Sequence, residues 1–394
     1  MTPRRLRSYV VKQLGLQSYL DAPGDGRRRP QIPAAVLVWA LLVGQVLREC
    51  SFHGVEALVR SRARGALRVR RHFGDDTLGY FTERLDPGAT RTALAATVRQ
   101  AKRNKAFGAR RWIGLAIDGT GAGHGHAAGC ALCHPVRDSA GATVGALHHF
   151  ELISVVGAGL TLPFDVEPYG PGDCEYAAGQ RLLQRAVAQV GSRFADYVVA
   201  DGAFATAPFL HLASDLGVGV VVRLKDNLPT LLAAATARFT AQPASVTFED
   251  GSERIELWDA DDFDPWETLQ WTTVRVLRYR QHKADGRVVE AYWLTDLPPQ
   301  RVSSRLLYGF AKSRWEIENE GFNEGKSRHG MEHIPHHHTT SLLMWWLLIS
   351  FALTIERLYR LRYLHRGRHR PLTAIAFVRA LRLSLGSLRR LDTS

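Results

Sequence analysis

Hydrophobic residues recur with helical spacing at both ends of this chain and with strand-like spacing between them. Up to about residue 105 the apolar positions follow three- and four-residue steps, which predicts a helical N-terminal region. Its helices are expected at residues 32–47, 53–59, 75–85 and 90–105. From residue 111 onward the apolar runs become short and are bounded by glycine and aspartate, a pattern typical of β-strands.

The central region predicts three strands, of which two form a hairpin, followed by helix, strand, helix and strand. The strands are expected at residues 112–117, 146–156, 160–167, 197–200 and 218–223, and the helices at 173–190 and 207–216. This order of elements builds an α/β fold with a ribonuclease H-like mixed five-stranded sheet and flanking helices.

Two aspartates each follow one of these predicted strands. Asp118 comes after the first strand and Asp201 after the fourth. The first and fourth strands of such a sheet lie side by side, so we expect the two carboxylates to point into one crevice. An Asp-Gly pair after a strand is also an ordinary turn signal, and each aspartate alone is weak evidence.

Later residues predict an inserted β-subdomain and then a return to helices. Alternating segments at 244–249, 254–259, 271–280 and 287–295 are rich in tryptophan and typical of antiparallel strands. Residues 306–326 form an amphipathic pattern that predicts a helix. The most apolar run, residues 342–353, is too short to span a bilayer and predicts a buried helix.

The balance of charge favours a polyanionic partner. The chain carries 51 Lys and Arg against 38 Asp and Glu, a formal net charge of +13, which points to DNA or RNA first and to an anionic membrane surface second. Arginines cluster at residues 60–71, where a phosphate-contacting surface and a solvated charged face are both open readings. The first ten residues lack the apolar core of a secretory signal, and four cysteines in 394 residues imply a reducing compartment, hence a cytoplasmic location.

One glutamate lies on the apolar stripe of the helix expected at 306–326. Glu318 shares this stripe, whereas Glu316, Glu320 and Glu324 are expected on the opposite, solvated side. A carboxylate in such a position needs a cation or hydrogen-bond donors. Arg314, one turn earlier, would supply an ordinary ion pair.

The alternative hypothesis joins Glu318 to the two aspartates as a metal-binding triad. Divalent-metal phosphoryl transfer needs hard oxygen ligands that hold two ions roughly 3.5–4 Å apart. Asp118, Asp201 and Glu318 meet that demand if the fold brings them together. The basic residues elsewhere would then serve a nucleic acid polymer.

Four segments of the sequence resemble DDE transposases of the IS4 type, which bacterial insertion sequences encode. They are IDGT around Asp118, ADGAF around Asp201, RLKDN at residues 223–227 and RWEIENEGFNEGKSRHGMEH at residues 314–333, and the resemblance spans about residues 111–346. In that family a helix motif of Tyr, Arg, Glu and Lys surrounds the catalytic Glu. Arg314 and Glu318 match its Arg and Glu, whereas the Tyr position holds Ala311, with Tyr308 nearby, and Lys326 falls one residue later than the usual spacing.

The resemblance implies a catalytic mechanism. Asp118, Asp201 and Glu318 would bind two Mg²⁺ ions, with Mn²⁺ as a substitute, for cleavage at the element's ends and strand transfer into target DNA by a cut-and-paste route. The residues implied as DNA contacts are Arg314, Lys326, Tyr308 and Lys225, with Trp293 as a candidate for stacking on a flipped base. Core packing is the alternative for any tryptophan of the insertion.

The resemblance also implies an organisation and a setting. The predicted domains are a helical basic DNA-binding domain (1–108), a catalytic core (109–226 and 298–340), the β-rich insertion (227–297) and a helical C-terminal segment (341–394). The partners would be double-stranded DNA, both transposon ends and target, and a second copy of the chain in a synaptic complex, with no membrane. The protein would lie in the bacterial cytoplasm, on the nucleoid when bound to DNA.

Cysteine and histidine residues after the first strand could form a structural Zn²⁺ site. Cys130 and Cys133 form a C-A-L-C motif that His134 follows directly, and further histidines lie at 124, 126, 148 and 149. Two loop cysteines beside titrating histidines are the alternative. Histidines 336–338 suggest a metal or phosphate contact or a solvated loop, and the acidic residues at 165, 167, 173 and 175 are expected to be caps and surface charge.

Two other functions remain open. One is a catalytically silent or domesticated DNA-binding protein on the same fold. The other is a nuclease that hydrolyses DNA without joining it. A strand-transfer assay in Mg²⁺ separates both from a transposase.

Overall fold

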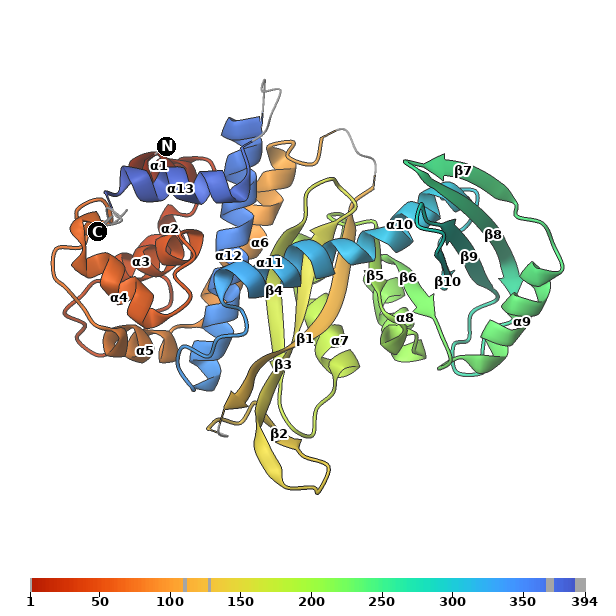
Figure 1. Ribbon diagram of the computed structural model, residues 1–394, viewed down its shortest axis with the longest axis horizontal. Helices are drawn as coiled ribbons and strands as arrows, with labels where there is room; N and C mark the ends of the chain where they lie inside the picture. Colours follow the sequence, from red (N-terminus) through yellow and green to blue (C-terminus); the bar gives the residue numbers. More distant parts are fainter. Residues whose placement is uncertain (1, 109–111, 127–128, 366–371, 387–394) are drawn as a thin grey trace.

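Three parts of the molecule lie side by side in Figure 1: a helical lobe, a central sheet crossed by one long helix, and a second lobe of strands. The computed structural model describes residues 2–108, 112–126, 129–365 and 372–386, without the side chains of residues 124–126. The histidines at 124 and 126 therefore lie outside the described side chains.

The central sheet has the strand order expected from the sequence. Its five core strands run in the order β4-β3-β1-β5-β6; β3 is antiparallel to both β4 and β1, and β1, β5 and β6 are parallel to one another. The fold is therefore α/β with a ribonuclease H-like sheet, as predicted. The strands are β1 (Gly114–His126), β3 (Thr143–Val156), β4 (Leu162–Tyr169), β5 (Tyr197–Ala200) and β6 (Gly219–Leu224), and the helices between them are α7 (Glu175–Val190) and α8 (Ala207–Asp215).

Strand β1 is longer than the sequence indicated. It continues eight residues beyond Asp118, so this aspartate lies inside a strand, paired with Leu152, and the prediction of a strand end there was wrong. The glycine-rich continuation does not look like a strand, but pairing with β3 supplies the hydrogen bonds that its weak propensity does not favour. A further strand, β2 (Cys133–Arg137), pairs with β3 where a loop was expected.

The inserted strands extend the central sheet. They are β7 (Val246–Asp250), β8 (Glu253–Phe263), β9 (Val274–His282) and β10 (Val288–Thr295), preceded by helix α9 (Pro229–Thr240). Strand β10 pairs antiparallel with β6, so the described residues form one ten-stranded sheet instead of a five-stranded sheet with a detached insertion. The backbone groups of β6 that would otherwise form an open edge are thereby paired.

The helical lobe combines both ends of the chain. Its helices are α1 (Pro3–Lys12), α2 (Gln17–Asp21), α3 (Ala34–Val46), α4 (Phe52–Arg60), α5 (Asp75–Glu83), α6 (Pro87–Arg103), α12 (Thr339–Arg360) and α13 (Ala374–Ser384). Helix α12 contacts α3, α5 and α6 on one side and strand β4 on the other, so it ties the lobe to the sheet.

Helix α12 is longer than the apolar run that predicted it. With its continuation to His365 it is long and apolar enough to cross a membrane by length and composition, which corrects the expectation that the run is too short. Its most apolar window is entirely buried inside the protein, with Trp345 and Trp346 fully enclosed. In this structure α12 is the central core helix that the sequence predicted.

The helix expected at residues 306–326 crosses the sheet (Figure 1) in three consecutive pieces. They are α10 (Ser304–Glu316), a π-helical stretch (Ile317–Asn323) and α11 (Glu324–His329). Packing fixes α10 on the sheet, because Phe310 stacks on Tyr197 of β5 with ring centroids 4.0 Å apart. The Tyr197 hydroxyl also lies 3.1 Å from the Ser313 hydroxyl.

Candidate functional site

The two aspartates lie on neighbouring parallel strands. The register pairs Leu115 with Val198 and Ala116 with Val199, and continuing it by two residues sets Asp118 level with Asp201. Side chains in register on parallel strands point to the same face of the sheet. Asp201 follows β5 directly and accepts a hydrogen bond from the Ala203 backbone N–H at 2.8 Å, which fixes its carboxylate at the strand end.

Arg314 of α10 joins Asp118 to Glu318. Its two terminal nitrogens donate to Asp118 Oδ2 at 2.9 Å and to Glu318 Oε1 at 2.6 Å. The guanidinium is 7% exposed, Asp118 14% and Glu318 39%, so the group forms a crevice that opens toward Glu318. The Arg314–Glu318 ion pair considered from the sequence is present, and Asp118 shares the same cation.

Two of the other glutamates of the crossing helix have partners inside the protein. Glu316 accepts hydrogen bonds from the Gly157 backbone and the Thr161 hydroxyl at 3.1 and 3.2 Å. Glu324 binds Arg357 at 2.7 Å and Arg328 at 2.9 Å. The prediction that these two glutamates are solvated was therefore wrong, whereas Glu320 is exposed.

Lys225 is the cation of the other aspartate. Its ammonium lies 2.7 Å from Asp201 Oδ2. Burial acts to raise the pKa of Asp201, but the hydrogen bond and charge of Lys225 outweigh it and hold the pKa below its ordinary value. This ion pair is what the structure assigns to Lys225, and a contact with DNA phosphate stays a prediction.

Asp118 has the opposite electrostatic balance. Burial raises its pKa to about 6 against the pull of Arg314, and the negative charges of Glu318 and Asp201 add to the rise. The influence of both other acids on Asp118 is the electrostatic sign that the three carboxylates share one site.

Two further glutamates, which the sequence did not identify as part of the site, approach strand β1. Glu151 of β3 is fully buried, and neither carboxylate oxygen has a hydrogen-bond partner among the described residues. Glu151 pairs with Gly119 of β1. A Cβ atom at position 119 would lie 2.4 Å from the Glu151 carboxylate and 3.2 Å from that of Glu175, so both carboxylates lie close against the β1 backbone. Burial and the charges of Glu175 and Asp118 raise the pKa of Glu151 well above its ordinary value. A single carboxylate inside the apolar run of β3 was the signal for it.

The other predicted caps and surface charges also need correction. Asp165 is fully buried and binds Arg91 and Arg185 at 2.9 and 2.7 Å. Glu175 is half-buried, and burial with the charge of Asp201 raises its pKa. Cys174 is the residue that precedes α7, so Asp173 is not its cap and instead pairs with Arg181.

Tyr308 and Trp293 are not at the surface. Tyr308 is 5% exposed and packs edge-on against Tyr279 and Phe248 of the insertion. Trp293 is fully buried in β10. Both residues serve the core in this structure, which contradicts their assignment as DNA contacts. Lys326 is partly exposed and pairs with Glu332 at 3.0 Å, so its assignment as a DNA contact stays a prediction.

Cysteine and histidine side chains form a second cluster beside the β2–β3 hairpin. Cys130, Cys133, His148 and His337 place their ligand atoms within 4.8 Å of one another. His134 is not among them, because its Nε2 lies 3.0 Å from the Tyr169 carbonyl oxygen. His336, the neighbour of His337 in the run of histidines at 336–338, lies 2.7 Å from Glu83. Both histidines therefore contact other parts of the protein and do not belong to a solvated loop.

The acidic residues offer a donor set that suits Mg²⁺. Carboxylate oxygens are the ligands this ion prefers, and a cation would relieve the raised pKa of Asp118. The carboxylate oxygens of Asp118, Asp201 and Glu318 do not all lie within 4.8 Å of one another, the separation within which the cysteine–histidine cluster falls among the described residues. The carboxylates are paired with Arg314 and Lys225 instead, so a metal ion would compete with these two cations for the carboxylate oxygens.

Comparison with known proteins gives one distant structural likeness. No protein-family model matches the chain, and no curated protein matches its sequence. Seven chains of solved structures match. One is from the cryo-EM structure of the piggyBac transposase synaptic complex with hairpin DNA, at 13% sequence identity and a TM-score of 0.47, over 98% of this chain and 80% of that chain. A likeness at this level assigns neither family nor activity.

Proposed function

We propose that this protein is a DDE-type DNA transposase of the IS4 type, which cleaves the ends of an insertion sequence and transfers them into target DNA. The observation that carries the proposal is the convergence of Asp118, Asp201 and Glu318. They come from β1, the end of β5 and the crossing helix; Arg314 bridges Asp118 and Glu318, and the charges of Glu318 and Asp201 both raise the pKa of Asp118. Three of the four motifs that resemble the family contain these residues, and the fourth contains Lys225, the cation that pairs with Asp201.

The three carboxylates would hold the two Mg²⁺ ions, which supply activation of the attacking oxygen and stabilisation of the leaving oxygen. The protein's own groups position this set. The β1–β5 register aligns the aspartates, and Arg314 fixes Asp118 and Glu318 relative to each other. Arg314 is 7% exposed and its terminal nitrogens donate to Asp118 and Glu318, so its contact with DNA phosphate stays a prediction.

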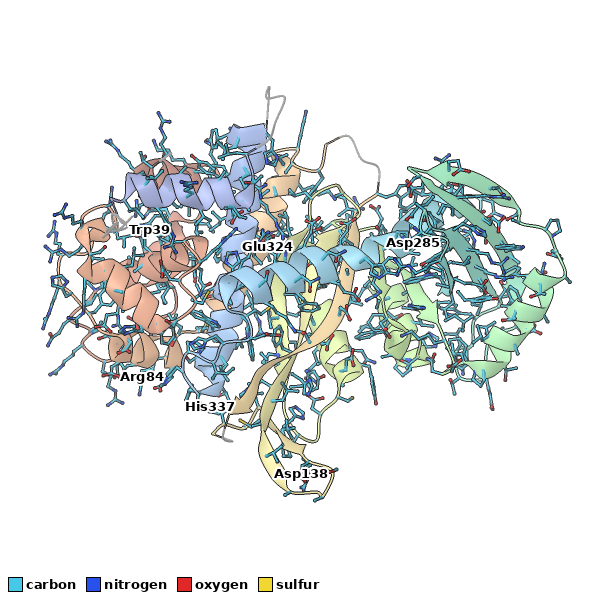
Figure 2. The ribbon with its side chains drawn as sticks, in the orientation of Figure 1. Trp39, Arg84, Asp138, Asp285, Glu324 and His337 are labelled. Atoms are coloured by element: carbon cyan, nitrogen blue, oxygen red, sulfur yellow. The ribbon has the colours of Figure 1, made fainter. Side chains whose placement is uncertain are left out.

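A basic surface on the helical lobe supports DNA as the substrate. Between residues 60 and 73, buried apolar residues alternate with exposed arginines, so the cations face outward. The exposed arginines are Arg60, Arg62, Arg68, Arg70 and Arg71. Long side chains project from the outer edge of this lobe in Figure 2. Such a surface provides sequence-independent phosphate contacts, and two copies of the chain would present two of them to paired transposon ends.

The test is cleavage and strand transfer in Mg²⁺ with DNA that carries the sequences flanking the gene, plus a supercoiled target plasmid. Asp118→Asn, Asp201→Asn and Glu318→Gln are each expected to reduce cleavage by about a thousandfold or more, because each removes a metal ligand. DNA affinity should stay within about threefold, since phosphate contacts dominate binding. Glu320→Gln, an exposed neighbour on the same helix, is the matched control and should keep full activity.

The outcomes separate the proposal from its rivals. Joined plasmid products in the wild type, lost in the three variants, support the transposase. Cut ends without joined products identify a nuclease, and DNA binding without either identifies a silent DNA-binding protein. Full activity in any one of the three variants removes that residue from the site.

A further inference from the structure

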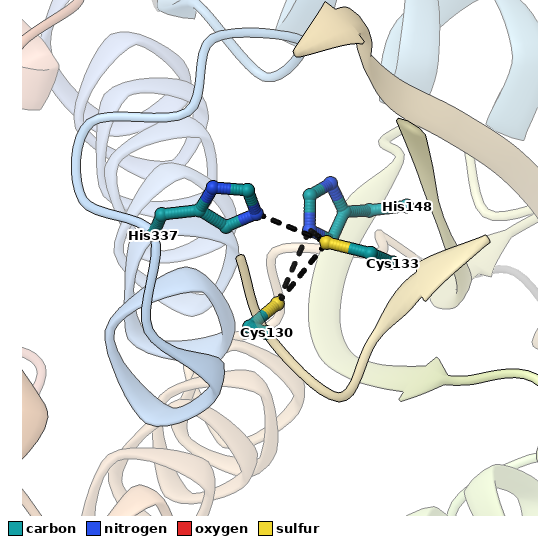
Figure 3. A group of neighbouring side chains, drawn as sticks. All are labelled: Cys130, Cys133, His148 and His337. Carbon is teal, nitrogen blue, oxygen red and sulfur yellow. Dashed lines mark hydrogen bonds between the residues drawn. The ribbon is translucent and has the colours of Figure 1, made fainter. Parts of the chain in front are cut away.

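Four side chains of the types that ligate metals converge on one point from three separate segments of the chain. Cys130 comes from the turn before β2 and Cys133 from the first residue of β2, whereas His148 comes from β3 and His337 from the loop that precedes α12. Figure 3 shows the two sulfur atoms and the two imidazole rings turned toward a common centre. Cys133 and His148 are buried, so the centre is enclosed by protein.

The spacing of these atoms resembles the edges of a small tetrahedron. The Sγ atoms of Cys130 and Cys133 are 3.7 Å apart, and both lie 3.4 Å from His148 Nε2. Cys133 Sγ lies 3.0 Å from His337 Nε2. For tetrahedral zinc with ordinary bond lengths, sulfur–sulfur edges are about 3.8 Å and sulfur–nitrogen edges about 3.6 Å. The four distances given are each within about 0.6 Å of these edges, and all four ligand atoms lie within 4.8 Å of one another.

The backbone around the cysteines is arranged as a metal-binding turn. The Cys133 N–H donates to the Cys130 carbonyl oxygen at 3.2 Å, which closes the turn between the two thiols. The Gly129 N–H donates to Cys133 Sγ at 3.4 Å, a contact that stabilises a thiolate. A Cβ atom at position 129 would lie 2.7 Å from the His337 ring, so glycine is required for that imidazole to reach the centre.

We propose that Cys130, Cys133, His148 and His337 bind one structural Zn²⁺ ion. Four protein ligands of the Cys₂His₂ type give a closed tetrahedral site, which is the form of structural zinc and leaves no position for a substrate. A disulfide is the competing use of two neighbouring cysteines. Its sulfur–sulfur bond is about 2.05 Å, and it would leave both histidines without a role.

The ion fastens the loop after the crossing helix to the sheet. The ligands at 130, 133 and 148 lie around the β2–β3 hairpin, whereas His337 is about two hundred residues further along the chain. Between α11 and α12 the same loop is joined to β1 by a backbone hydrogen bond from Gly123 to Glu332 at 3.0 Å and to α5 by the contact of His336 with Glu83 at 2.7 Å. A zinc ion adds a further attachment to the sheet, and through it the ion stabilises the position of α11 and the helix that carries Glu318.

Metal analysis of the full-length protein purified without a polyhistidine tag tests this site. The wild type is expected to hold about one zinc ion per chain, and Cys133→Ser to hold less than about a tenth of that. His337→Ala should release zinc to a competing chelator at least about tenfold more readily, whereas His337→Cys keeps a ligand and should retain the ion. His134→Ala and Cys50→Ser are matched controls, because neither side chain belongs to the cluster.

Cobalt substitution gives a readout that does not depend on how well a variant folds. Wild-type protein loaded with Co²⁺ should show the visible absorption of a tetrahedral site with thiolate ligands. The proposal is overturned if the purified wild type contains no metal and Cys130 and Cys133 react as free thiols or are joined as a disulfide. Full zinc content in Cys133→Ser also overturns it. None of these measurements involves DNA, so they stand apart from the test of transposition.

Discussion

Strands β1 and β3 each contribute one residue to a set of potential metal ligands, Asp118 to the acidic set and His148 to the cysteine–histidine set, on the same face of the sheet. Asp118 lies opposite Leu152, and four residues further along, Ala122 lies opposite His148, which also pairs with Cys133. Four residues of strand span about 13 Å. Between the two sets, Phe150 stacks on Trp346 of α12 with ring centroids 4.3 Å apart, so an apolar wall separates them.

The two sets differ in hardness, in charge balance and in access. The acidic set offers oxygen atoms, is balanced by Arg314 and Lys225, and opens at Glu318. The cysteine–histidine set offers sulfur and nitrogen in an enclosed place. An open oxygen site suits an exchangeable Mg²⁺ and a substrate, whereas a closed sulfur–nitrogen site suits a permanent ion. One pair of strands can thus serve catalysis and stability separately.

Chelation should produce the largest difference between the two sites. Dialysis against a mild chelator is expected to lower DNA cleavage by about a thousandfold or more, because Mg²⁺ exchanges freely, and Mg²⁺ or Mn²⁺ should restore it. Zinc content and melting temperature should not change in the same sample. Conversely, Cys133→Ser should lower the melting temperature by about 5 °C or more, whereas Glu318→Gln should leave it nearly unchanged. Zinc that is lost together with magnesium contradicts this division.

The acidic site should also make the free energy of unfolding depend on pH, an effect smaller than that of chelation. The pKa of Asp118 is raised from 3.8 to about 6, so the folded protein binds this proton more tightly than the unfolded chain. The stability that this group contributes is therefore present below about pH 4 and is lost as the pH rises through about 6, by up to about 3 kcal/mol. Asp118→Asn should remove this loss and unfold at higher urea concentration than the wild type at pH 7.5 without metal.

The same experiment contains its control. Saturating Mg²⁺ should narrow the difference between the wild type and Asp118→Asn, because the ion compensates the carboxylate charge. A variant that is less stable than the wild type at pH 7.5 would mean that the ion pair with Arg314 outweighs burial.

The smallest expected effect concerns DNA binding at the rim of the acidic crevice. Lys326→Ala should weaken DNA binding about threefold and reduce the salt dependence by about one charge, if this partly exposed ammonium contacts a phosphate. Tyr308→Phe should change neither quantity, because the hydroxyl is buried against the insertion. Binding measured at several salt concentrations checks both. A larger effect from Tyr308→Phe would require that the insertion moves away from α10.

The order of elements could be predicted from the sequence because it depends on local patterns. The four-residue strand before Asp201 is buried on both faces and reads as a short apolar run, and β5 has the predicted bounds. The continuation of β1 was missed because its glycines and histidines have no strand propensity of their own. Its pairing with β3 is a tertiary effect, and no local pattern reports it.

The candidate sites were predictable only in part for the same reason. Asp118, Asp201 and Glu318 stood out as carboxylates on apolar elements. His337 could not be assigned to the cysteines, since only the folded chain brings it beside Cys133. Trp293 and Tyr308 were assigned from position in a motif, which says nothing about burial, and both lie in the core.

In the IS4-type motif that we propose for this chain, Lys326 comes one residue late, and the π-helical stretch from Ile317 to Asn323 gives this position a spatial meaning. A π-helix arises where a helix absorbs an extra residue without breaking. The added residue increases the number of residues in the helix, but the wider π-turn accommodates it locally. The residues that follow therefore keep their orientation about the helix axis. Lys326 can therefore come one residue later in the sequence than the motif expects and still face the same side of the helix.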